Sequence, residues 1–195
     1  MRNETLLTIT PSQTVGPFYA YCLAPIGYDF SPLASQSLAT ADAVGTRITI
    51  KGLLLDGAGE PVPDGLIEIW QPDGEGRFAG HHPALKHSEF KGFGRTLCDD
   101  AGDFSFETVK PGRVMTRDGR LQAPHIAVAI FGKGLNRQLC TRIYFDDEKS
   151  NSADPILNMV PDNLRQSLIA TSSADQSYKI VIRLQGEGET VFFQA

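Results

Sequence analysis

The chain carries four histidines, the side chains used most often as metal ligands, and three of them lie close together. His81, His82 and His87 fall in the segment GHHPALKH, which reads as a loop. The adjacent His81 and His82 point apart in an extended chain, and Pro83 restricts the backbone further. No further ligands for zinc or iron can be identified for this cluster. The pattern favours polar loop histidines over a metal site.

The fourth histidine, His125, opens the apolar run HIAVAIF. Alternate side chains of a strand share a face, so His125 and Ala127 point the same way. Two histidines at this spacing would form one edge of a metal site, but alanine offers no ligand. The residues alone leave three possibilities for His125: half of a metal site, part of a site completed from elsewhere, or the remnant of a lost site.

Other catalytic signatures are missing from the sequence. It contains no G-x-S-x-G motif, and GAGEP and GEGET lack the lysine of a phosphate-binding loop, so both are read as turns. The cysteines Cys22, Cys98 and Cys140 are odd in number, far apart and without a C-x-x-C spacing. They are predicted to be free thiols in a reducing compartment.

Length, composition and charge restrict the class of protein. Of the 195 residues, 41% are hydrophobic and 21% are charged, and the formal net charge is −5. These values suit one domain with a sizeable core and exclude the domain-wide basic surface that is typical of nucleic-acid-binding proteins. No apolar run reaches the ~18 residues of a membrane span, and the N-terminus lacks the apolar core of a secretion signal. We therefore expect a cytoplasmic protein with no nucleic-acid or membrane partner.

The elements that must position these residues are mostly strands. Short runs rich in β-branched and aromatic residues alternate with turn signals such as DGAGEPVPDG and PDGEG. The expected strands occupy residues 46–55, 66–70, 93–100, 102–109, 125–132, 142–147 and 178–193. Many short strands between Gly- and Pro-rich turns predict an all-β fold, a two-sheet β-sandwich with long loops.

Two segments depart from this pattern. A short helix is expected within residues 161–172, with Asp162 as its N-cap and apolar residues at Leu164 and Leu168. Residues 1–45, rich in Pro, Gly and aromatic residues, predict an extended N-terminal arm ahead of the sandwich at residues 46–195. Exposed aromatic side chains are costly in water, so the arm should pack on its own domain or, as we expect, on a partner chain.

Several motifs follow one another along the chain: SQTVGPFY, DGAGEPVPDGLIEIWQPDGEGRF, DFSFETVKPG, APHIAVAIFGKG, TRIYFDDE and RLQGEGETVFF. Together they resemble the intradiol ring-cleavage dioxygenases over nearly the whole chain. The resemblance implies a β-sandwich and a non-haem Fe(III) held by two tyrosinates and two histidines. It also implies a catechol-type substrate that chelates Fe(III) through both hydroxyl oxygens and is cleaved by O₂ between the hydroxyl-bearing carbons.

The resemblance also indicates which ligands this chain lacks. The strand that reads His-x-His in iron-bearing members of the family has His125 followed, two residues on, by Ala127. The KPG turn leads to Val114 where a tyrosine ligand is expected, and the long loop after the WQ strand contains no tyrosine. An arginine that precedes the first histidine is replaced by Gln122. Three of four ligands are missing, which implies an iron-free subunit in which His125 is a hydrogen-bonded structural residue.

An iron-free subunit implies a partner chain. The match is closest to the metal-free chain of family members built from αβ units, in which the partner binds Fe(III) and the units assemble further. By this resemblance Thr14, Gly16 and Pro17 would line a substrate pocket at the chain interface, and Lys133 would attract the carboxylate of a carboxylated catechol. Arg142 would put a charge into the vacated pocket and pair with a nearby carboxylate. The alternatives are a transthyretin-like binding module without an enzyme partner, and a self-sufficient metalloenzyme based on the loop histidines.

Overall fold

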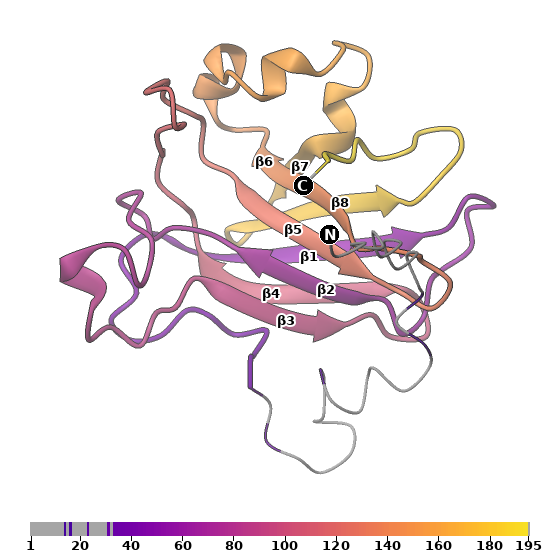
Figure 1. The fold of residues 1–195 in the computed structure, drawn as a ribbon, viewed down its shortest axis with the longest axis horizontal. Helices are drawn as coiled ribbons and strands as arrows, with labels where there is room; N and C mark the ends of the chain where they lie inside the picture. The colour runs from indigo at the N-terminus through magenta and orange to yellow at the C-terminus, as the bar shows by residue number, and fades with distance from the viewer. Residues whose placement is uncertain (1–13, 15, 17–22, 24–30, 32, 195) are drawn as a thin grey trace, which may run out of the picture.

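The computed structural model describes residues 14, 16, 23, 31 and 33–194 (Figure 1). Its eight strands are β1 (Arg47–Leu55), β2 (Leu66–Trp70), β3 (Phe93–Leu97), β4 (Asp103–Val109), β5 (Ile126–Phe131), β6 (Leu139–Phe145), β7 (Ile169–Ser173) and β8 (Ser177–Arg183). Short 3₁₀ helices lie in the connections: η2 (Pro83–Leu85), η3 (Lys149–Ala153), η4 (Leu157–Met159) and η5 (Arg165–Leu168). The all-β prediction is confirmed.

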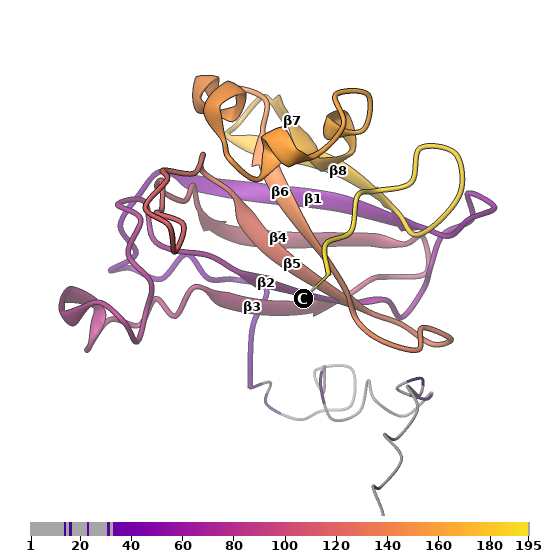
Figure 2. The same ribbon diagram turned by 45° about the horizontal axis from the view of Figure 1, so that its top comes forward.

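The strands form two four-stranded groups that are joined into one continuous order, β3-β2-β5-β6-β7-β8-β1-β4. The join is narrow, because β6 and β7 pair in parallel through only Tyr144 with Ile169 and Phe145 with Ala170. The groups lie as two layers with the core between them (Figure 2). The expected sandwich is therefore present, with its two sheets linked at one corner.

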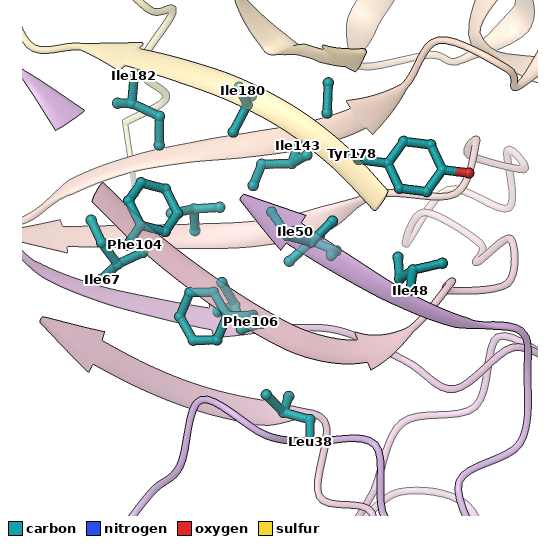
Figure 3. Packing of buried hydrophobic residues seen from close by; sticks show 14 of the residues in the cluster. Leu38, Ile48, Ile50, Ile67, Phe104, Phe106, Ile143, Tyr178, Ile180 and Ile182 are labelled. Atoms are coloured by element: carbon teal, nitrogen blue, oxygen red, sulfur yellow. The ribbon is translucent and has the colours of Figure 1, made fainter. Parts of the chain in front are cut away.

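The core follows from the alternation of apolar residues in the strands. Ile48 and Ile50 of β1 and Phe104 and Phe106 of β4 point inward from one layer (Figure 3). The opposite layer contributes the buried alternate residues of β2, β5 and β6, among them Ile67, Ile69, Ile126, Val128, Ile130 and Ile143. Both sets belong to a single cluster, so the two groups of strands fold as one unit.

Residues 35–39 lie between the two edge strands, β3 and β4. The amide of Arg95 donates to Ser35 O (3.1 Å), and the amide of Leu38 donates to Glu107 O (2.7 Å). Leu38 is buried in the core. This part of the predicted arm packs on its own domain. Of residues 1–32 of the arm, the structure describes only positions 14, 16, 23 and 31.

The helix predicted within residues 161–172 is present only as one 3₁₀ turn, and its predicted N-cap is wrong. A single 3₁₀ turn, η5, leads directly into β7, which the sequence did not indicate. Asp162 is no N-cap and instead forms an ion pair with Arg165 (2.8 Å). The start of β7 pairs with β6, and both Leu168 and Ala170 are fully buried. Strand pairing and burial leave four residues for helical structure, because local propensity is a weak preference that tertiary contacts override.

Two further expectations concern cysteines and the membrane. Within the described part of the chain Cys98 and Cys140 are free thiols, and Cys22 lies outside it. Burial raises the pKa of the Cys98 thiol to about 12, so this side chain is unreactive at neutral pH. None of the described helices is long and apolar enough to cross a membrane.

Candidate functional site

The candidate site lies on the outer face of β2, β5 and β6, which is turned away from the core. Cross-strand pairing places two rows of side chains on this face: Trp70–Ala127–Arg142 and Glu68–Ala129–Cys140. Residues of the opposite phase, such as Ile69 and Val128, are buried in the core. The register thus puts Ala127, a position where the family resemblance implies a ligand, directly beside Arg142.

These rows line a groove of about 680 Å³. Its lining includes Trp70 and Phe93 from one side and Phe193 from the other. Phe193 is held there because the C-terminal segment runs beside β6, where the amide of Phe193 donates to Cys140 O (2.8 Å; Figure 2). The groove is a concave and mostly apolar surface with one arginine at its side.

His125 immediately precedes β5 and is only 9% exposed. Its Nδ1 lies 2.8 Å from Ala123 O, and its ring lies 5.6 Å from the ring of Tyr144. Burial and then the positive charge of Arg142 lower the pKa of His125 to about 4. The imidazole is therefore neutral at pH 7, and its Nδ1–H donates to the carbonyl oxygen of Ala123.

Arg142 belongs to a polar chain that runs beneath the groove. Its Nη1 donates to Gln122 Oε1 (2.8 Å) and to the hydroxyl of Tyr144 (3.3 Å). The Tyr144 hydroxyl in turn donates to Asp154 Oδ1 (3.1 Å). The expected ion pair between Arg142 and a carboxylate is wrong, because no described carboxylate lies within ion-pair distance of this guanidinium. Asp154 is reached only through the tyrosine hydroxyl.

Asp154 is fully buried and ties three segments together. Its carboxylate accepts from the amides of Ala123 (2.7 Å), Ile156 (2.9 Å) and Leu157 (2.7 Å) as well as from Tyr144. Such a set of donors stabilises a buried carboxylate. Sequence reasoning missed both Asp154 and Tyr144. Two signals were available: an Asp-Pro dipeptide, which favours turn initiation, and a tyrosine two residues after Arg142 on the same strand.

The structure brings together the five residues that the resemblance assigns to the lost ligand site: Val114, Gln122, His125, Ala127 and Arg142. The amide of Gln122 donates to Val114 O (2.8 Å), and the Gln122 side chain accepts from Arg142. Arg142 is paired with Ala127, and His125 packs on Tyr144 in the same layer. None of these contacts involves a loop histidine, and His82 has a local role, since its Nδ1 accepts from the amide of Ala84 and caps η2.

Of the four residues predicted to line the substrate pocket, the structure describes Thr14, Gly16 and Lys133. Thr14 Oγ1 accepts from the amide of Gly134 (3.0 Å), in the turn that carries the exposed Lys133. Gly16 has φ +77°, a conformation that favours glycine, and an added Cβ would meet no described atom within 4 Å. Pro17 lies outside the described residues. Thr14 and Lys133 thus lie near the end of β5, whereas His125 lies at its beginning, so the structure does not unite the two groups.

Comparison with known proteins identifies the family. The dioxygenase family profile matches residues 16–186. The chain is 42% identical to the protocatechuate 3,4-dioxygenase alpha chain of Burkholderia cepacia, with 97% of this chain and 98% of that one covered. It is 30% identical to the beta chain from Burkholderia cepacia, with coverages of 86% and 75%. This chain belongs to the intradiol dioxygenase family.

Solved structures of intradiol dioxygenases share the fold. The dioxygenase domain of a carbohydrate-binding fusion protein from Streptomyces sp. SirexAA-E superposes with a TM-score of 0.60 at 24% identity, covering 91% of this chain and 98% of that one. Catechol 1,2-dioxygenase from Acinetobacter sp. ADP1 gives a TM-score of 0.63 at 16% identity, covering 82% and 60%. These similarities do not favour the alternative of a transthyretin-like module.

Intradiol dioxygenases use iron, and the side chains around Ala127 do not fit a ferric site. Ala127 and Val114 have no donor atom, and the Tyr144 hydroxyl is engaged by Asp154 and Arg142. Burial raises the pKa of Tyr144, which opposes the tyrosinate that Fe(III) prefers. The guanidinium of Arg142 would repel a cation here. Among the described residues no group of three or more His, Cys, Asp or Glu side chains could hold a metal ion.

Proposed function

We propose that this chain is the iron-free alpha subunit of protocatechuate 3,4-dioxygenase. With an iron-bearing beta subunit it would support cleavage of protocatechuate by O₂ to 3-carboxy-cis,cis-muconate, both oxygen atoms entering the product. The identity to named alpha chains, 42% and 40%, against 30% to a beta chain supports this assignment. The proposal places the chain in cytoplasmic αβ units that assemble into a larger oligomer.

The observation that carries the proposal is the state of the family's metal position. Ala127 and Val114 stand where the family resemblance implies ligands and carry no donor atom, and the space beside Ala127 holds Arg142, braced by Gln122 and Tyr144. The fold of an intradiol dioxygenase is retained around a site without ferric ligands. A chain of this kind contributes to intradiol cleavage only if another chain supplies Fe(III), which would bind the two hydroxyl oxygens of the substrate.

The placement of Thr14 and Lys133 supports a pocket shared with that partner. Both lie at the end of β5 opposite to His125, so they cannot line the pocket around this chain's own His125 and Ala127. In the proposal Thr14, Gly16 and Pro17 form part of the wall of the partner's pocket. The ammonium group of Lys133 attracts the substrate carboxylate and so orients the ring before it reaches the partner's metal.

Co-expression tests the proposal. The full chain should be produced alone and together with a related chain that carries His-x-His and both tyrosine ligands. We expect a stable complex with about one iron per pair and protocatechuate cleavage, and we expect neither in this chain alone. Metal analysis, the visible tyrosinate-to-Fe(III) absorption and O₂ uptake are the measurements. Stoichiometric iron and activity in the isolated chain, or no association with the iron-bearing chain, would contradict the proposal.

A further inference from the structure

The groove on β2, β5 and β6 owes its depth to small side chains in the middle strand. Ala127 of β5 lies between Trp70 and Arg142 of the two neighbouring strands, and Ala129 lies between Glu68 and Cys140. Side chains standing on a pleated sheet project by their own length, so two alanines between larger neighbours leave a trough. The trough lies among the lining residues of the 680 Å³ groove, a volume suited to a small organic molecule.

The walls of this trough are aromatic. Trp70 is 41% exposed, its indole is stacked on Phe78 at 6.1 Å, and it lies 6.3 Å from the ring of Phe93. Across the trough stands Phe193 of the C-terminal segment. A flat ring lying over Ala127 would bury its faces against alanine methyl groups and its edges against these aromatic side chains, which favours an aromatic ligand over a flexible aliphatic one.

The charge of the trough is positive. Two charged residues line it, Glu68 and Arg142. Glu68 is neutralised by Arg95, whose Nε and Nη2 both contact Glu68 Oε1, at 2.8 Å and 2.5 Å. Arg142 has only neutral neighbours: it donates through Nη1 to Gln122 and Tyr144, and its guanidinium lies 5.8 Å from the Phe193 ring. Its remaining N–H groups have no acceptor among the described residues, so an anion would complete its hydrogen bonding.

We propose that this groove binds a small planar aromatic carboxylate, with the carboxylate against the Arg142 guanidinium and the ring over Ala127 and Ala129. Charge complementarity selects this occupant over an apolar protein segment. A segment of that kind would bury Arg142 without a counter-ion, and an unpaired charge is costly to remove from water. The inference rests on the groove alone and does not depend on the proposed enzymatic partnership.

The single tryptophan of the chain makes binding directly measurable, because Trp70 lines the groove. The full chain is titrated with benzoate while tryptophan fluorescence is recorded, with calorimetry in parallel. Benzamide, which has the same shape and no charge, is the matched ligand control. We expect saturable binding of benzoate and binding of benzamide weaker by at least about tenfold, the scale of a lost charge-assisted hydrogen bond. Absence of saturable benzoate binding would overturn the proposal and leave the groove to a protein contact.

Variants locate the binding site. Arg142→Gln should weaken benzoate binding by about tenfold or more, whereas Arg120→Gln, which removes an exposed arginine paired with Asp118, should leave it unchanged. Because Arg142 also braces Gln122 and Tyr144, its loss could disturb the fold, which circular dichroism would reveal. Ala127→Leu provides the second test, since it fills the trough and keeps the arginine. Benzoate binding that survives Ala127→Leu, or that survives Arg142→Gln in a folded chain, would reject this site.

Discussion

At the scale of single residues, burial decides which groups beside the groove can ionise. His125 is enclosed by the carbonyl of Ala123 and the ring of Tyr144, and a protonated imidazole would lose solvation and face the charge of Arg142. Its pKa in the folded chain is therefore about 4, against a usual value of 6.5. A histidine that stays neutral here is compatible with the guanidinium next to it, which explains how the two coexist in one layer.

This depressed pKa predicts a dependence of stability on pH. The unfolded chain takes up a proton at His125 near pH 6.5, whereas the folded chain does so only near pH 4. Stability from this group is therefore present above pH 6.5 and is lost as the pH falls toward 4, by on the order of 3 kcal/mol. In His125→Asn the amide can still donate to Ala123 O but cannot titrate. Urea unfolding across this window should show a shallower loss for the variant, and an identical pH profile would contradict the assignment.

At the scale of elements, the contact between β1 and β4 depends on a missing side chain. Gly52 of β1 is paired with Phe104 of β4, and the Phe104 ring lies across the glycine. A Cβ added at Gly52 would come within 2.0 Å of Phe104 Cζ. Phe104 also packs edge-on against Phe106 at 6.2 Å and is buried (Figure 3). The glycine thus determines the position of an aromatic ring in the core.

Gly52→Ala should therefore destabilise the chain by about 1–3 kcal/mol, since the Phe104 ring must leave its place in a packed core. Gly132→Ala is the matched control, because its added Cβ would meet Leu135 only at an ordinary 3.5 Å. The measurement is the free energy of unfolding in urea. In the double variant Gly52→Ala/Phe104→Leu a smaller side chain replaces the ring. Its loss in free energy of unfolding should therefore be smaller than the sum of the losses of the two single variants. Equal stability of Gly52→Ala and Gly132→Ala would show that the ring has no such constraint.

At the scale of the whole molecule, the two ends of β5 have different surroundings. At one end Arg142 belongs to a polar chain with Gln122 and Tyr144, on which His125 packs, and at the other Lys133 is exposed beside Thr14. Under the proposed function the second end faces the partner chain, where catalysis occurs on a metal that this chain does not bind. Changes at that end should alter catalysis without altering metal content.

Lys133→Ala in the complex should raise KM for protocatechuate several-fold, because a partly exposed charge pair contributes up to ~1 kcal/mol. Catechol, which lacks the carboxylate, should be affected less. Gly16→Val should impair both substrates, since it strains a backbone at φ +77° and crowds the pocket regardless of charge. Lys149→Ala, an exposed lysine remote in sequence, is the control. Steady-state kinetics and iron content are measured together, and equal losses of Lys133→Ala on both substrates would reject the carboxylate role.

Much of the fold and one half of the candidate site could be predicted from the sequence. Alternating apolar residues such as Phe104 and Phe106 determine strands and their buried face by a local rule, and the strands that it indicated are present. The absence of ligands at Ala127 and Val114 is also a property of residue type, because an alkyl side chain cannot coordinate a metal. That β7 replaces the expected helix was not predictable, since parallel pairing with β6 outweighs local propensity.

The tertiary structure alone decided what surrounds Ala127, a position where the family resemblance implies a ligand. Arg142 is partnered by Gln122, and Tyr144 by Asp154, through contacts between segments whose separation in the sequence carries no period or motif. The groove likewise depends on register, which aligns Ala127 between larger residues of two other strands. The type of a side chain is a property of each residue by itself. Hydrogen-bond partners and concave surfaces depend instead on which strands become neighbours, and that is decided only when the core forms.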